Sequence, residues 1–333
     1  MTRFIKLKND VGTEVILCNV GASIYDIRFI DKDKKMESIL YTTKRKHDYP
    51  YNTPYLGMTI GRTGGRITDG KFELNGIKYT IPSDDPNGLH GGRKSLSYQH
   101  FKYKKIKTLE YDEVLFSYYS PDMESGYPGN LDLKVSYKLF KKENKLLISY
   151  NGISDKDTLL NLSNHAYFNL SGNAKNDILD QELFIDSKKM LRIKNALPDE
   201  IIETKDIYSF NNLHRIKDNL FAEEIINNTK GYDFPYLLEK NLEYPIILKD
   251  NASKRVMKIR TSYPAVVVYT CNYPSNLKMN NNKIMKDYYA VCLECMYPPN
   301  SINNPFIEDK KDILRKNEKY DEFIEINLEV SND

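Results

Sequence analysis

Residues 131–139 read LDLKVSYKL, and this stretch decides the class of fold. Leucine, valine and tyrosine stand at the odd positions, whereas aspartate, lysine and serine stand at the even ones. Because successive side chains of a strand point to opposite faces, this period of two places one face on a core and the other in water. The stretch therefore predicts a half-buried strand.

Similar strand patterns recur along the chain, at residues 114–119, 145–150, 265–271, 290–295 and 324–330. Asn75-Gly76 separates two further apolar runs and is typical of the type I′ turn of a β-hairpin. Helical periodicity is scarce, although residues 206–228 could hold a helical turn or two within a long connection. Strands separated by turns, without alternating helices, predict an all-β sandwich with few short helices.

The composition is typical of a protein with a large core. Hydrophobic residues make up 40% of the 333 residues, and aromatic area comes mainly from 26 tyrosines because tryptophan is absent. Large all-β folds can exceed the usual domain length as one unit, and we find neither a repeat nor a Pro/Gly/Ser-rich linker. The candidate site residues described below run from position 66 to position 294. We therefore expect a single domain over residues 1–333.

The charge balance argues against a nucleic-acid or membrane partner. Forty-nine Lys and Arg against 46 Asp and Glu leave a net charge of +3 at pH 7, which produces no strong field. We interpret the basic runs at 44–46 and 102–107 as solvated strand faces. No stretch approaches the roughly 20 apolar residues that span a bilayer, and residues 1–10 lack the apolar core of a secretory signal. We expect a cytoplasmic protein.

The four cysteines, Cys18, Cys271, Cys292 and Cys295, form no disulfide framework. Cys292 and Cys295 have CxxC spacing, but neither a second pair nor histidines at ligand spacing lie nearby. The sequence therefore predicts buried small residues and no metal site.

Two of the five histidines lie in amide-rich or glycine-rich motifs: His165 in NLSNHAYFNLSG (161–172) and His90 in NGLHGG (87–92). The other three stand in charged or Asn-rich surroundings that predict exposure. A histidine changes charge near neutral pH, which suits it to acid/base chemistry, and an apolar environment needs a reason to hold one. His90 and His165 are therefore candidate functional residues.

Glu294 lies in the apolar run AVCLEC (290–295), where a carboxylate is costly unless it is paired or at the mouth of a cleft. Such settings raise a carboxyl pKa and favour a general base, although an outward-facing strand glutamate fits the spacing equally well. GRTGGR (61–66) lacks the ending of a P-loop. Its Arg66 could present donors to sugar hydroxyls or could pair with a surface carboxylate.

Seven segments together resemble the sequence blocks of the aldose 1-epimerase, or galactose mutarotase, family. They are GRTGGRI, NGLHGG, GYPGNL, NLSNHAYFNLSG, GYDF, PAVVVYTCN and CLECMYPPNSINNP, and they cover nearly the whole chain in the family's order. The resemblance implies a large antiparallel β-sandwich with an open cleft on one sheet. It also implies a small-molecule monosaccharide as partner and no cofactor.

The resemblance further implies roles for individual residues. It implies Glu294 as the general base, His165 as the general acid, His90 as a substrate-binding residue that assists the chemistry, and Arg66, Asp233 and Tyr167 as substrate-binding residues. In mutarotation a base takes the proton of the anomeric hydroxyl while an acid protonates the ring oxygen, and the opened sugar closes again as the other anomer. The implied activity is an aldose 1-epimerase acting on free hexoses such as glucose and galactose.

The chain departs from the family pattern at four places. Many members have asparagine at Gly65, histidine at Phe234, glutamine at Val267 and a threonine-glutamine pair at Cys295 and Met296. A hydrogen bond to a sugar hydroxyl discriminates between sugars only where its protein partner exists, so these substitutions bear on which hexose is preferred. Neither the preferred sugar nor an oligomeric state is predicted.

Two alternatives remain open at this point. Epimerisation of hexose 6-phosphates would want additional Arg or Lys in the cleft, and the sequence assigns no such cluster. A carbohydrate-binding or regulatory protein could have kept the cleft and lost catalysis, although the joint presence of Glu294, His165 and His90 argues against that reading.

Overall fold

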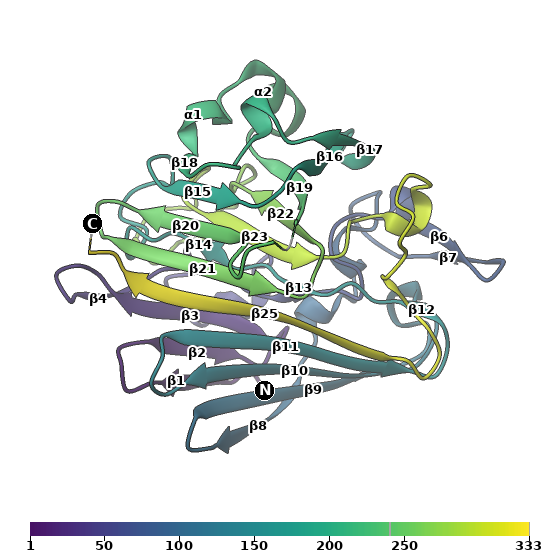
Figure 1. The fold of residues 1–333 in the computed structure, drawn as a ribbon. Helices are drawn as coiled ribbons and strands as arrows, with labels where there is room; N and C mark the ends of the chain where they lie inside the picture. The colour runs from purple at the N-terminus through teal and green to yellow at the C-terminus, as the bar shows by residue number, and fades with distance from the viewer. Residues whose placement is uncertain (240, 333) are drawn as a thin grey trace.

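The computed structural model describes residues 1–239 and 241–332, and most of its strands belong to three antiparallel sheets. The largest has nine strands in spatial order. These are β18 (His214–Arg215), β15 (Glu182–Ile185), β20 (Ile246–Asp250), β21 (Arg255–Thr261), β25 (Lys319–Val330), β11 (Lys145–Ser154), β10 (Leu131–Phe140), β9 (Tyr111–Ser120) and β8 (Lys102–Lys107). Figure 1 shows β25, β11, β10 and β9 crossing the front of the molecule.

A second sheet of six strands lies behind the first in this view (Figure 1). Its spatial order is β14 (Tyr167–Phe168), β23 (Val291–Met296), β22 (Ala265–Tyr269), β19 (Asp233–Leu237), β16 (Lys189–Lys194) and β17 (Leu197–Glu203). A third sheet contains β1 (Phe4–Lys8), β2 (Glu14–Cys18), β3 (Ser23–Ile30) and β4 (Met36–Ser38).

Short ladders, two short α-helices and several single-turn 3₁₀ helices lie outside these three sheets. The ladders are β5 (Thr59–Ile60) with β13 (Ser163–Asn164), β6 (Lys71–Leu74) with β7 (Ile77–Thr80), and β12 (Thr158–Leu159) with β24 (Ile313–Leu314). Helices α1 (Lys217–Leu220) and α2 (Glu223–Thr229) lie together at the top of Figure 1. Both fall within residues 206–228 or one residue beyond, where the sequence predicts a helical turn or two.

The two large sheets pack face to face, and the main core lies between them. Phe234, Val268 and Leu293 of the six-stranded sheet belong to the same buried cluster as Ile259 and Ile326 of the nine-stranded sheet. The predicted all-β antiparallel sandwich is therefore confirmed, and burial of these side chains is its main stabilising term. The opposite face of the six-stranded sheet is left free to form a site.

The stretch 131–139 forms most of β10, and the predicted alternation is confirmed with one exception. Ser136 belongs to the polar set but is buried, because its hydroxyl donates to the Glu113 carboxylate at 2.5 Å. The predicted hairpin is also confirmed: Asn75 and Gly76 both have positive φ, at 53° and 76°, as a type I′ turn requires. The basic run at 102–107 is the exposed edge strand β8.

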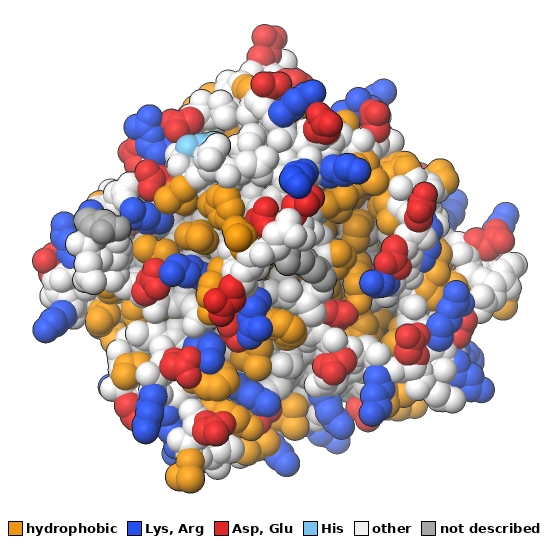
Figure 2. All heavy atoms as spheres, in the orientation of Figure 1, with side chains coloured by type: hydrophobic (Ala, Val, Ile, Leu, Met, Phe, Trp, Pro, Cys, Tyr) orange, Lys and Arg blue, Asp and Glu red, His pale blue; other side chains and the backbone are white. Residues whose placement is uncertain are grey.

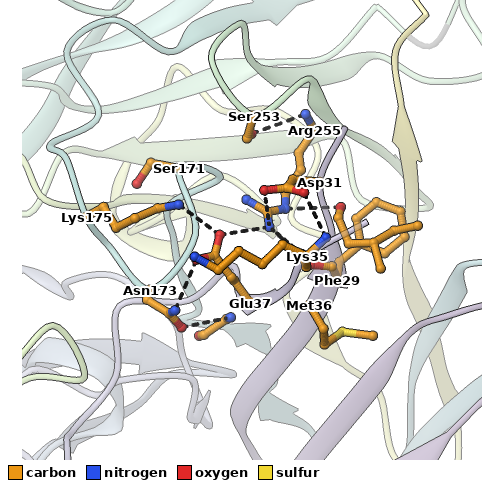
Figure 3. A network of polar contacts seen from close by, with 12 residues as sticks. Phe29, Asp31, Lys35, Met36, Glu37, Ser171, Asn173, Lys175, Ser253 and Arg255 are labelled. Carbon is orange, nitrogen blue, oxygen red and sulfur yellow. Dashed lines mark hydrogen bonds and ion pairs between the residues drawn. The ribbon is translucent and has the colours of Figure 1, made fainter. Parts of the chain in front are cut away.

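An ionic network around the buried Glu37 and Arg255 joins the four-stranded sheet to the nine-stranded sheet (Figure 3). The carboxylate of Glu37 in β4 receives the side chains of Lys35, Lys175 and Arg255, at 3.0, 2.9 and 3.2 Å. Burial would raise the pKa of Glu37, but these three cations lower it to about 2. Because Arg255 begins β21, this network fixes the packing of one sheet on another.

The surface carries both signs of charge. Figure 2 shows Lys/Arg and Asp/Glu side chains interspersed over the face seen in Figure 1, in agreement with the small net charge. Within the described residues, no helix is both long and apolar enough to cross a membrane. All four cysteines are buried and free, as the sequence predicts.

Candidate active site

A cleft of about 250 Å³ opens on the free face of the six-stranded sheet. Register places Val267 of β22 opposite Glu294 of β23 on one side and opposite Pro235 of β19 on the other. All three side chains line the cleft, and so does Tyr269, which pairs with Cys292 in the same two strands. Glu294 therefore faces the cleft and not solvent, which resolves the two orientations that the sequence left open.

His165 lies at the bottom of this cleft and is held there by its own backbone. Its N–H donates to the carbonyl of Met58 at 2.9 Å, and its carbonyl accepts from the N–H of Gly57 at 2.8 Å. Asn164 adds a side-chain hydrogen bond to the Gly57 carbonyl at 2.9 Å. The amides of the segment 161–172 therefore serve to tie down the chain on which the histidine stands.

The side chains of His165 and Glu294 approach each other, with 3.4 Å between Nε2 and Oε1, and both are nearly fully buried. Burial raises the pKa of Glu294 well above its usual range; the nearby Asp233 raises it further and Arg66 lowers it. Burial lowers the pKa of His165 to about 4. Because burial disfavours the charged form of each group, the pair as a whole is neutral: it carries one proton more than a carboxylate beside a neutral imidazole.

His90 completes a cluster with these two residues. One ring nitrogen of His90, one ring nitrogen of His165 and one carboxylate oxygen of Glu294 all lie within 4.8 Å of one another. The two imidazole rings meet edge to face, with centroids 5.2 Å apart. His90 stands in the short helical turn Leu89–Gly91, and its Nδ1 accepts a hydrogen bond from the N–H of Gly65 at 3.1 Å.

That hydrogen bond fixes the tautomer of His90. Burial, with His165 and Arg66 nearby, lowers the pKa of His90 well below its usual value, so the ring is neutral. Because Nδ1 accepts from Gly65, the single hydrogen is on Nε2, which can donate to a ligand. The same hydrogen bond argues against a metal ion on the cluster, since a metal needs the Nε2 lone pair.

Arg66 and Asp233 lie at the wall of the cleft. Arg66 Nε donates to the Asp85 carboxylate at 3.1 Å, and each side chain is about one quarter exposed. Both readings of Arg66 therefore apply, because it pairs with a carboxylate and also lines the cleft. Asp233 is the first residue of β19, and burial, opposed by Arg66, raises its pKa to about 6.

Tyr167 lines the cleft, but its hydroxyl donates to the Pro54 carbonyl at 3.0 Å and its ring stacks on His165. It therefore offers a ring face to the site, whereas its hydroxyl is engaged elsewhere. Two further tyrosines of the cleft were not predicted from the sequence: Tyr55, whose ring centroid lies 4.9 Å from that of His90, and Tyr269, whose ring centroid lies 6.0 Å from that of His165. Tyr55 has a left-handed φ of 60°, and its local sequence does not predict this conformation.

The sequence model of the aldose 1-epimerase family matches residues 3–327. The chain belongs to the aldose 1-epimerase family. It is 30% identical to the aldose 1-epimerase of Haemophilus influenzae, over 97% of this chain and 94% of that protein. It is 28% identical to the galactose mutarotase of Rattus norvegicus, over 90% of this chain and 86% of that one.

Solved structures give the same assignment of the fold. An aldose epimerase homologue from C. elegans superposes with a TM-score of 0.90 at 22% identity and covers 100% of both chains. A galactose 1-epimerase from Lactobacillus acidophilus superposes with a TM-score of 0.86 at 26% identity, covering 99% of this chain and 98% of that one. The resemblance read from the sequence motifs is confirmed.

The departures from the aldose 1-epimerase pattern fall on two sides of the sheet. Gly65, Val267 and Met296 line the cleft, whereas Phe234 and Cys295 face the core. Gly65 has a φ of 75°, and a Cβ there would lie 2.7 Å from the Pro299 Cβ. An asparagine at position 65 would therefore require the loop of Gly65 and the loop of Pro299 to move apart.

Proposed function

We propose that this member of the family interconverts the α and β anomers of free hexoses. The observation that carries the proposal is the 3.4 Å approach of His165 Nε2 to Glu294 Oε1 at the bottom of a cleft, with His90 alongside. A base and an acid at this separation can reach the two oxygens bonded to one anomeric carbon.

The proposed chemistry needs only proton transfers. Glu294, as carboxylate, removes the proton from the anomeric hydroxyl, while His165 donates its Nε2 proton to the ring oxygen and the bond from C1 to that oxygen breaks. After rotation about the C1–C2 bond the two transfers reverse on the other face of the aldehyde. Positioned acids and bases each contribute roughly 10²- to 10⁴-fold, and no cofactor takes part.

The remaining cleft residues would orient the sugar. His90 Nε2–H and the Arg66 guanidinium are donors, and Asp233 is an acceptor. Hydrogen bonds to the charged Arg66 and Asp233 are each worth about 1.5–3 kcal/mol, and one from the neutral His90 about 0.5–1.5 kcal/mol, so together they can hold a hexose in one register. Glucose and galactose are the first substrates to test.

A hexose 6-phosphate is less well supported. Among the described residues that line the cleft, Arg66 is the one Lys or Arg, and its Nε already bonds to Asp85. A phosphate dianion would require further cationic donors.

Polarimetry of freshly dissolved α-D-glucose and α-D-galactose tests the proposal. We expect the protein to accelerate mutarotation, and we expect Glu294→Gln and His165→Asn to lower kcat by about 10²- to 10⁴-fold. Glu73→Gln and His100→Asn change the same residue types at exposed positions and should behave as wild type. Wild-type rates equal to those of buffer would refute catalysis and favour a sugar-binding protein.

A further inference from the structure

The two ring nitrogens of His165 have different partners. Nε2 faces Glu294, whereas Nδ1 lies 3.5 Å from the sulfur of Cys292, two residues before Glu294 on the same face of β23. Cys292 is fully buried, and the backbone pairs it with Tyr167 in the adjacent strand β14. The sulfur therefore lies at one ring nitrogen and the Glu294 carboxylate at the other.

The imidazole is packed so that its two nitrogens cannot easily exchange places. Tyr167 stacks on the ring at a centroid distance of 5.1 Å and Tyr55 at 6.2 Å. His90 and Tyr269 meet the ring edge to face, at 5.2 and 6.0 Å. A flipped ring would turn Nε2 away from Glu294.

The proton count of the pair decides which atom is the donor in the contact with sulfur. With one net proton shared between His165 and Glu294, the pair is either imidazolium with carboxylate or neutral imidazole with carboxylic acid. In the second state the acid donates to Nε2, so the ring hydrogen must be on Nδ1. Both states therefore place a hydrogen on Nδ1, and the sulfur accepts it.

We propose that Cys292 is a positioning residue, whose sulfur accepts a hydrogen bond from Nδ1–H of His165 and so confines the exchanging proton to Nε2. The inference rests on the proposed function. In many functional histidines a carboxylate or carbonyl oxygen accepts the hydrogen of the second ring nitrogen and fixes the orientation of the ring, and we assign this role to Cys292.

The proton balance of the proposed reaction requires this arrangement. When His165 gives its Nε2 proton to the ring oxygen, Glu294 gains the proton of the anomeric hydroxyl, and the imidazole is left neutral with its hydrogen on Nδ1. A histidine that began with its only hydrogen on Nε2 would have to become an imidazolate. Retention of Nδ1–H throughout the cycle is therefore a condition for the acid role.

Sulfur is a suitable acceptor because it is a weak one. A carboxylate in this place would stabilise the imidazolium strongly and make it a poorer acid. Burial raises the pKa of the Cys292 thiol well above its usual range, and Glu294 raises it further, so the thiol stays uncharged at working pH. The contact thus orients the ring without adding a negative charge.

Removal of the sulfur should change kcat and the pH–rate profile in a defined direction. In Cys292→Ala the buried Nδ1–H of His165 loses its acceptor. This favours the deprotonated state of the His165–Glu294 pair, in which a carboxylate stands beside a neutral imidazole. We expect kcat to fall about tenfold with KM nearly unchanged, and the alkaline limb of the pH–rate profile to move to lower pH by about one unit. The groups that face the ring and stay unchanged are Glu294, His90, Tyr55, Tyr167 and Tyr269.

Cys295→Ala is the matched control, because it truncates another buried cysteine of β23 that faces the core. It should lower the melting temperature to a similar extent and leave the pH profile in place. Identical kcat values and pH profiles in the two variants would overturn the inference while leaving the proposed function intact.

A second measurement needs neither a variant nor turnover. The ¹⁵N shifts of His165 in the wild-type protein report which nitrogen carries the hydrogen, and we expect a protonated Nδ1 from pH 5 to pH 8. A bare Nδ1 over this range would mean that the thiol donates, which would overturn the inference. Absence of mutarotation by the wild-type protein would instead refute the proposed function.

Discussion

Asp233 and Glu294 are carboxyl groups in one cleft, yet burial affects their pKa values to different extents. Asp233 is half-buried at the wall and its pKa lies at about 6, whereas the pKa of the fully buried Glu294 rises much further. The first value falls within the range over which enzymes are assayed, so the two groups can be separated by titration.

Sugar binding should depend on pH through Asp233. Its carboxylate form is the better acceptor, and because its pKa is raised, that form is present above about pH 6 and lost below it. We expect KM to rise about tenfold between pH 7 and pH 5. In Asp233→Asn, KM should be higher at pH 7 and flat with pH.

Initial polarimetric rates over a range of sugar concentrations measure this effect, with Asp84→Asn as the control because Asp84 is 84% exposed and outside the cleft lining. An Asp233→Asn variant that kept the wild-type rise in KM would show that another group causes it.

At the scale of single residues, the sequence was informative where a titratable side chain is costly to bury. Glu294 and His165 could be singled out because a charge inside an apolar run requires a partner. The contacts of Tyr167 and Tyr55 could not, because the hydroxyl of Tyr167 bonds to Pro54, 113 positions away in the chain. Such pairings depend on the completed fold.

At the scale of elements, close contact between two glycine-rich loops places His90. Gly91 has a φ of 88°, and a Cβ at this position would lie 2.0 Å from the carbonyl oxygen of Gly61. The segments GRTGGR and NGLHGG therefore meet backbone to backbone at this point, which is why each carries glycine there.

Gly91→Ala should force these loops apart and displace His90 from Gly65. We expect a lower melting temperature and a fall in kcat/KM of about 100-fold, the size typical of a misplacement near 1 Å. Gly76→Ala is the control, because its φ is also positive but no atom lies within 4 Å of the added Cβ. That variant should lose about 1–2 kcal/mol of stability and keep its activity; equal activity of both variants would contradict the account.

The elements themselves were predictable where periodicity or turn chemistry is local, as in β10 and the hairpin of β6 and β7. The spatial order of strands was not. For example, β25 at the end of the chain lies between β11 and β21. Every residue of β23 is buried, so exposure could not have assigned its faces, although alternation correctly places Cys292 and Glu294 together.

At the scale of the whole molecule, the network around Glu37 links two sheets (Figure 3). Arg255 is 1% exposed, and removal of one partner from a buried ion pair costs about 3–5 kcal/mol. We expect Arg255→Met to lower the free energy of unfolding by that amount. Lys258→Met is the control on the same strand: the side chains of Lys258 and its partner Glu329 are 31% and 50% exposed, and exposed pairs contribute about 0–1 kcal/mol.

The same network predicts how stability changes in acid. Because the pKa of Glu37 is lowered to about 2 from an ordinary 4.5, its contribution is fully present above pH 4.5 and is lost as the pH falls toward 2. Denaturant unfolding at pH 7 and pH 3 measures this. An Arg255→Met variant as stable as Lys258→Met at pH 7 would mean that the network does not couple the sheets.

Exchange between the two anomers at equilibrium, measured by magnetisation-transfer NMR on D-galactose, is the sharpest test of catalysis by Glu294 and His165, because it follows ring opening itself. We expect the wild-type protein to raise the exchange rate in proportion to its concentration, and an equal amount of folded Glu294→Gln to give a rate about 10²- to 10⁴-fold lower. An exchange rate that is the same with Glu294→Gln as with wild type, or the same with wild type as in buffer, would contradict it.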